Sequence, residues 1–167
     1  MELRQVTQDL HHACERHPIG QALANGTVTD QQYADWLLVQ LRIHEAIDPH
    51  LAPELERASA MQADIDTLDI VPHESRMAEA YAETLTYDAA RAGAAYVMVG
   101  AHLMGGAMIA RAVGDRLPHD HIPKGEERQT MLRAWRPLRE RADLANEAVR
   151  CFGALLASME EIRQKTA

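Results

Sequence analysis

The chain has 167 residues, 47% of them hydrophobic, which suits one domain (residues 1–167) with a substantial buried core. Its formal net charge of −8, with no basic cluster beside aromatic residues, argues against a nucleic-acid partner. The sequence has no run of 18 apolar residues and no charged-then-apolar N-terminal pattern, so we expect a cytoplasmic protein that is not inserted in a membrane.

The first predicted helix covers residues 2–17 and is amphipathic. Leu3, Leu10 and Cys14 fall on one apolar stripe at helical spacing, and Pro18 ends the helix. Aromatic residues make up only 4% of the chain, a composition that favours close helix packing over strands. The sequence therefore predicts an all-α fold.

The remaining predicted elements follow in chain order. Asn25-Gly26 marks a turn, and a capping box at Thr29 and Gln32 opens a helix that runs through Ile47. Pro137 either kinks the helix expected over residues 126–136 or opens a new turn. We expect further helices over residues 53–66, 74–85, 87–113, 126–136 and 143–164.

The two cysteines, Cys14 and Cys151, lie far apart and match no paired metal spacing. We interpret both as buried thiols.

One flank of the first helix carries three groups that could serve a ligand. A helical wheel places Arg4, His11 and Glu15 within about 40° of one another. Glu15 could hydrogen-bond one ring nitrogen of His11, orient the imidazole and strengthen it as a metal ligand. An ordinary ion pair on a solvated edge is the simpler interpretation, and spacing alone favours it.

The helix predicted over residues 87–113 contains adjacent glycines, Gly105 and Gly106, which cost about 2 kcal/mol relative to alanine. Such a cost is tolerated where the helix bends or where something approaches its backbone closely. That neighbour could be a packed helix, which is the more common case, or a flat macrocycle.

Together these two segments resemble the heme oxygenase family. Residues 8–15, which read QDLHHACE, are similar to its proximal helix, where a histidine followed four residues on by a glutamate supplies the axial ligand. Residues 95–106, with Tyr96, Leu103 and the two glycines, are similar to its distal helix. The order and separation of the segments also match, and the similarity extends to residues 25–29, Trp135 and Phe152.

The resemblance implies a heme-oxygenase-like fold with heme held between the first helix and a kinked, glycine-containing distal helix. His11 would be the axial ligand of the heme iron, with Glu15 beside it. Arg4 and Tyr96 would meet a heme propionate, and Arg136 or Arg139 would meet another.

The distal helix would supply the catalytic wall, formed by Ala101, His102 and Gly105, with Gly106 also against the heme. His102 stands where many members carry an acidic residue, and Ala101 replaces a glycine. His102 could order water, ligate the iron or point outward. A register shifted by one residue would instead bring Gly100 and Met104 to the heme.

The activity implied is oxidative cleavage of heme to biliverdin, Fe²⁺ and CO, with O₂ and electrons from a ferredoxin or a flavin reductase. Heme would be both substrate and cofactor. One alternative is a heme-binding or sensor protein without turnover. Others are a di-iron oxygenase relative, although no Glu-x-x-His set is found, and a thiamine-degrading enzyme with Cys14 or Cys151 as nucleophile.

The other histidines have a plainer interpretation. His44 with Glu45 could belong to a metal site. Surface exposure is expected for those beside proline-containing turns, namely His17, His50, His73, His119 and His121.

Overall fold

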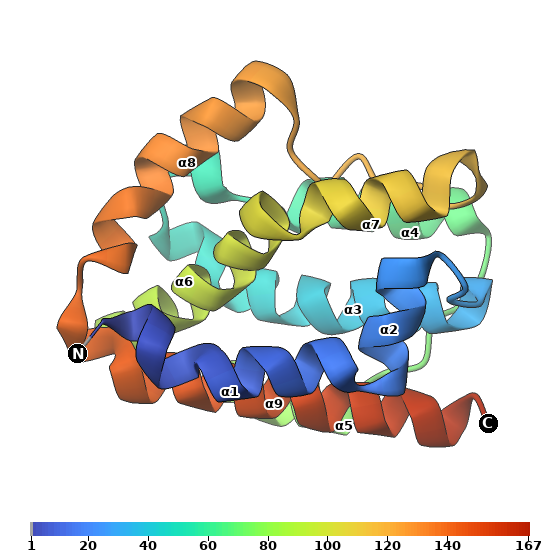
Figure 1. The fold of residues 1–167 in the computed structure, drawn as a ribbon, viewed down its shortest axis with the longest axis horizontal. Coiled ribbons are helices and arrows are strands. Elements are labelled where there is room, and N and C mark those ends of the chain that lie inside the picture. The colour runs from blue at the N-terminus through green and yellow to red at the C-terminus, as the bar shows by residue number, and fades with distance from the viewer. Residues whose placement is uncertain (1) are drawn as a thin grey trace.

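The computed structural model describes residues 2–167, and within them every regular element is a helix (Figure 1). The all-α prediction is therefore confirmed. The longer helices are α1 (Leu3–Arg16), α2 (Pro18–Asn25), α3 (Asp30–Ile47), α4 (Ala58–Leu68), α5 (Arg76–Glu83), α6 (Asp88–Met104), α7 (Gly106–Val113), α8 (Gly125–Arg139) and α9 (Ala145–Lys165). Short 3₁₀ turns cover Asp48–His50, Pro53–Leu55, Gly114–Arg116 and Ala142–Leu144.

The helices pack around one hydrophobic core in which α3, α6 and α9 are the central elements. The helix α1 lies along α9, while α3 packs against α4, α5 and α6 (Figure 1). On its other sides α6 contacts α8 and α9. Both cysteines are buried and unpaired, as predicted.

The first helix ends before Pro18, but the sequence did not predict that Pro18 begins α2. Proline fits the first turn of a helix because the N–H it lacks has no intrahelical partner there. The backbone N–H of Ile19 donates to Nδ1 of His17 at 3.1 Å, which caps the new helix. The predicted turn follows at Gly26, in the left-handed region at φ +71°.

The third helix agrees with its prediction at both ends. The hydroxyl of Thr29 accepts from the backbone N–H of Gln32, whose side chain accepts from the backbone N–H of Thr29, and the helix ends at Ile47.

The helix predicted over residues 53–66 begins five residues later, at Ala58. Its first turn is held by Asp48, because Oδ2 of this carboxylate accepts the backbone N–H groups of Arg57 and Ala58, both at 2.8 Å. An acceptor ten residues away in sequence thus sets this boundary. The following helix α5 begins after its capping residue Ser75 and ends at Glu83, two residues short of the prediction.

The single helix expected over residues 87–113 is two helices. The axes of α6 and the segment Gly106–Arg116 differ by 50°, with Gly105 between them. By contrast, α8 runs through Pro137 to Arg139, so no new turn begins at the proline. Pro137 lies in the last turn and has no N–H, so it leaves the carbonyl of Arg133 without its usual helical donor while the helix ends two residues later.

Among residues 2–167, no single helix is long and apolar enough to span a bilayer. Only the bent pair of α6 and Gly106–Arg116 reaches the length and hydropathy of a span when the two are taken together.

Candidate functional site

A cavity of about 280 Å³ lies between α1 and the bent pair of α6 and α7. In Figure 1, α1 runs below the two helices, α2 lies to the right and α3 passes behind them. Both α2 and α3 contribute residues to the cavity lining. The lining includes His11 and Glu15 from one side and Ala101, His102 and Gly105 from the other, and most of the remaining lining side chains are apolar. The two segments singled out in the sequence therefore share one cavity.

His11 lies on the α1 wall, and its side chain is 54% exposed. Its ring meets Phe152 of α9 edge-on, with the ring centroids 6.0 Å apart. Nε2 is 3.6 Å from Oε1 of Glu15, which is too long for a hydrogen bond. The imidazole is thus positioned mainly by packing, and a ring nitrogen remains available to a ligand.

A second histidine lies next to this position. Ligand atoms of His11, His12 and Glu15 all lie within 4.8 Å of one another, and in the part of the chain that the structure describes no other group of three such residues is that close. Only His11 and Glu15 of these line the cavity.

The opposite wall is formed where α6 bends into α7. Ala101 is exposed toward the cavity, and a Cβ added to Gly105 would meet nothing closer than the backbone oxygen of Ala101 at 3.4 Å. A Cβ on Gly106 would lie 2.6 Å from Cγ2 of Ile122. Gly105 therefore leaves this part of the cavity wall without a side chain, and Gly106 lets Ile122, in the segment before α8, pack closely against the helix.

Arg128 of α8 supports the bend, and no local sequence pattern indicates this role. Its Nη2 and Nε groups donate to the carbonyl oxygen of Leu103, at 2.7 and 3.2 Å. A helix that ends leaves its last carbonyls without intrahelical donors, and Arg128 satisfies one of them.

His102 does not point outward, which was one of the three possibilities considered. Its side chain is buried, with the residue 4% exposed, and it lines the cavity. Burial lowers the pKa of His102 well below 6.5, and the neighbouring His44, His121 and Arg57 side chains lower it further. His102 is therefore neutral at physiological pH.

His102 belongs to a buried chain of polar groups that begins on α3. Its Nε2 lies 3.3 Å from Nε2 of His44, and Nδ1 of His44 lies 2.8 Å from Oδ1 of Asp48. The suggested metal site at His44 and Glu45 is wrong as a pair, because Glu45 is exposed and bonds Arg42. Only the i,i+4 spacing of His44 and Asp48 could have indicated this pair from sequence.

His121 was expected at the surface but is 3% exposed. Its ring meets that of His102 edge-on, with the centroids 5.6 Å apart. Both Nδ1 and the backbone N–H of His121 contact Oδ2 of Asp64, at 2.7 and 2.9 Å. A proline-rich turn can thus be buried when a neighbouring helix supplies a carboxylate, which local sequence does not reveal.

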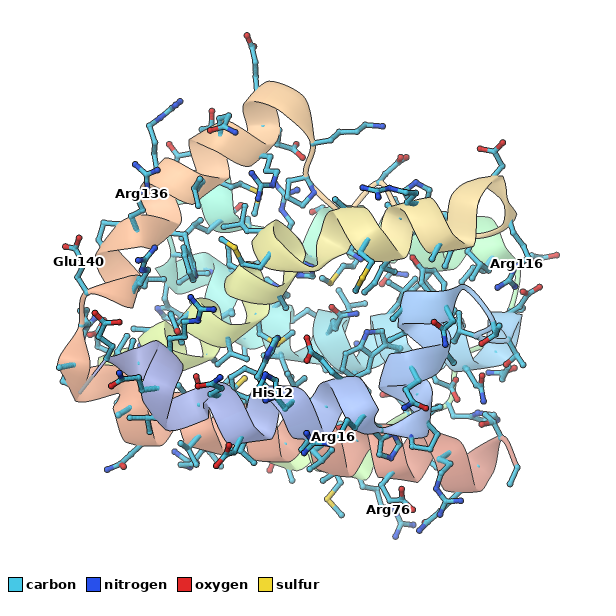
Figure 2. The ribbon with its side chains drawn as sticks, in the orientation of Figure 1. His12, Arg16, Arg76, Arg116, Arg136 and Glu140 are labelled. Carbon is cyan, nitrogen blue, oxygen red and sulfur yellow. The ribbon has the colours of Figure 1, made fainter. Side chains whose placement is uncertain are left out.

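Three of the predicted propionate residues, Arg4, Tyr96 and Arg139, lie near one another outside the cavity lining. Tyr96 stacks on Trp135 with the ring centroids 5.6 Å apart. Burial raises the pKa of Tyr96, while the nearby positive charges of Arg139 and Arg4 oppose this effect. Arg136 instead extends outward from α8 (Figure 2). Of the two alternatives on α8, Arg139 is the one beside Tyr96.

Comparisons with known proteins identify the family to which the chain belongs. A family model described as heme oxygenase matches residues 1–144. Heme oxygenase-1 from the cyanobacterium Synechocystis sp. PCC6803, solved in complex with heme, aligns at a TM-score of 0.82 and 14% identity, over 98% of this chain and 91% of that one. The heme oxygenase of Leptospira interrogans aligns at a TM-score of 0.76 and 19% identity, over 96% and 100%. No curated protein matches the chain. The family model covers most of the chain and these structures share its fold, so the chain belongs to the heme oxygenase family.

Proposed function

We propose that the protein cleaves heme to biliverdin, Fe²⁺ and CO, using O₂ and electrons from an external donor such as a ferredoxin or a flavin reductase. One observation carries the proposal. A single cavity has an imidazole, His11, on one wall and two small residues, Ala101 and Gly105, on the other.

The residues present suit a flat, largely apolar ligand with a metal at its centre. His11 offers a neutral nitrogen of the kind that binds iron. Ala101 and Gly105 leave room for a planar ring against α6. Met108 of α7, which lines the cavity and is 52% exposed, is a flexible apolar side chain that can cover such a ring.

The charged cluster near Tyr96 supports a role in binding the propionates. Heme carries two carboxylates, and a protein of net charge −8 must meet them with local cations. We assign this role to Arg4, Tyr96 and Arg139, and we withdraw it from Arg136 because that side chain extends away (Figure 2).

Bound heme would supply both the iron for O₂ chemistry and the meso carbon that is oxidised. The chain's own contribution is positional. His11 would hold the iron, the apolar lining would exclude bulk water, and the small residues Ala101 and Gly105 would let a planar ring approach α6. His102 lies on the same wall as a neutral side chain that can form hydrogen bonds.

Single-turnover spectroscopy tests the activity. Hemin is added to the protein, the complex is reduced with ascorbate or a ferredoxin system under air, and absorbance is followed. We expect the Soret band to decay as a bilin band rises, with CO released in equal amount. A heme complex that persists under these conditions would instead indicate a binding protein without turnover.

A further inference from the structure

The buried chain of Asp48, His44 and His102 joins α3 to the cavity wall, and the proposal above gives no role to Asp48 or His44. Its members come from the C-terminal end of α3, the 3₁₀ turn after it and α6. His44 is fully buried, and Asp48 is 6% exposed. Buried ionisable groups are costly, so a chain of them beside a cavity calls for an explanation.

The hydrogen bonds of Asp48 fix the direction of the chain. Oδ2 accepts two backbone N–H groups, from Arg57 and Ala58, which leaves Oδ1 for His44. A carboxylate only accepts hydrogen bonds, so His44 must carry its proton on Nδ1. With its one ring proton on Nδ1, His44 presents a lone pair on Nε2.

The same reasoning decides which ring nitrogen of His102 carries its proton. Since Nε2 of His44 accepts, Nε2 of His102 must donate across the 3.3 Å contact. Neutral His102 therefore has no proton on Nδ1, and among residues 2–167 this nitrogen makes no hydrogen bond. His102 lines the cavity, so the unprotonated nitrogen is left to a group that the cavity holds.

We propose that Asp48 and His44 are positioning residues for the cleavage reaction, which hold the proton of His102 on Nε2 and so make its Nδ1 a hydrogen-bond acceptor for water at the cavity wall. This inference rests on the proposed function. A water that donates one hydrogen to Nδ1 keeps its second hydrogen for a group in the cavity, so water and not the imidazole becomes the donor there.

The substitution Asp48→Asn should reverse the direction of the hydrogen bonds from position 48 through His44 to His102. Two backbone N–H groups require the amide oxygen at the Oδ2 position, which turns the amide NH₂ toward His44. His44 must then accept on Nδ1 and donate from Nε2, and His102 must move its proton to Nδ1. The matched control is Asp35→Asn, because Asp35 is also buried on α3 and accepts from the backbone N–H of His73 and contacts its ring.

Two measurements test the proposal on the whole protein. The first is long-range ¹H–¹⁵N NMR of the histidine rings without heme, which reports the protonated nitrogen. We expect Nε2–H for His102 in the wild type and in Asp35→Asn, and Nδ1–H in Asp48→Asn. The second is single-turnover heme cleavage, which we expect to slow by about 10- to 100-fold in Asp48→Asn. Hemin affinity should remain within about twofold, since Asp48 does not line the cavity.

Two further variants keep the test decisive if Asp48→Asn does not fold. In His44→Gln the amide NH₂ faces the carboxylate and its oxygen faces His102, so Nε2–H and turnover should be retained. In His44→Leu the acceptor is gone, so both should be lost. A proton on Nδ1 of wild-type His102, or equal turnover in Asp48→Asn and Asp35→Asn, overturns the proposal. If the wild type does not cleave heme, the proposed function fails, and the NMR result alone decides where the proton lies.

Discussion

His102 is a buried neutral histidine, and its protonation links pH to stability. Burial holds its pKa in the folded protein well below 6.5, with the neighbouring His44, His121 and Arg57 side chains adding to the effect. The unfolded chain binds a proton at this position as pH falls through about 6.5, whereas the folded chain does not. The free energy of unfolding should therefore fall as pH drops below about 6.5.

Urea unfolding of the heme-free protein between pH 7.5 and 5 measures this loss. His102→Gln removes the titrating group, so the stability advantage of the wild type over this variant should shrink as pH falls. A difference that stays constant across the range would show that His102 takes up a proton in the folded state as readily as in the unfolded one.

Cys14 lines the cavity, and its surroundings make its thiol less acidic. Burial, followed by the negative charge of Glu15, raises the pKa of Cys14 to about 11. Because the thiolate is the reactive form, a nucleophilic role for Cys14 at neutral pH is disfavoured. Iodoacetamide should label Cys14 slowly at pH 8 in the folded protein and rapidly in urea, and equally fast labelling in both would contradict the burial.

At the level of elements, the two adjacent glycines have different roles. Alanine at Gly106 would place Cβ 2.6 Å from Cγ2 of Ile122, a methyl group fixed on a branched carbon. We expect Gly106→Ala to lower the free energy of unfolding by about 1–3 kcal/mol. Gly105→Ala is the matched control, because its Cβ meets only ordinary contact distances.

The double variant Gly106→Ala with Ile122→Ala removes the clashing methyl and tests the cause. In urea unfolding, the Gly106→Ala penalty should be smaller in the Ile122→Ala background than in the wild type. Equal penalties in the two backgrounds would mean that Ile122 is not the obstacle.

Arg128 holds the bend through the Leu103 carbonyl. Arg128→Ala should cost about 1–2 kcal/mol, because it removes a charged donor from a partly buried carbonyl. Arg133→Ala, on the exposed side of the same helix, is the comparison and should cost less. Similar losses in urea unfolding for both variants would argue against a specific role at the bend.

The elements that the sequence predicted well are those governed by local signals. The capping box at Thr29 and Gln32 set the start of α3, and Gly26 set the turn before it. Boundaries set by distant groups were missed, as where Asp48 caps α4. The bend at Gly105 was recognised as a possibility, but its angle depends on Ile122 and Arg128, which come from elsewhere in the chain.

The candidate site was predictable to a similar degree. The sequence indicated His11 and residues 101–106 as candidate site residues, and His11 and members of that second segment line one cavity. It could not reveal the partners of His102, because His44, His121 and Asp64 approach from other elements. The choice of Arg139 over Arg136 likewise depends on how α8 continues through Pro137.

For the whole molecule, the cavity is a consequence of the packing of α1 on α9 and of the bend between α6 and α7. These two features place α1 on one side and the bend between α6 and α7 on the other (Figure 1), so that His11 and Gly105 line the same cavity. Binding of heme there, with His11 on the iron, is the claim on which the proposed activity depends.

Hemin titration of His11→Ala and His12→Ala, followed in the Soret region and by electron paramagnetic resonance, tests this claim most directly. His12 is the adjacent histidine on α1 but does not line the cavity. We predict that His12→Ala retains the wild-type spectrum, and that His11→Ala loses the signature of histidine ligation and recovers it when imidazole is added. A wild-type spectrum in His11→Ala, or loss of ligation only in His12→Ala, would contradict the account.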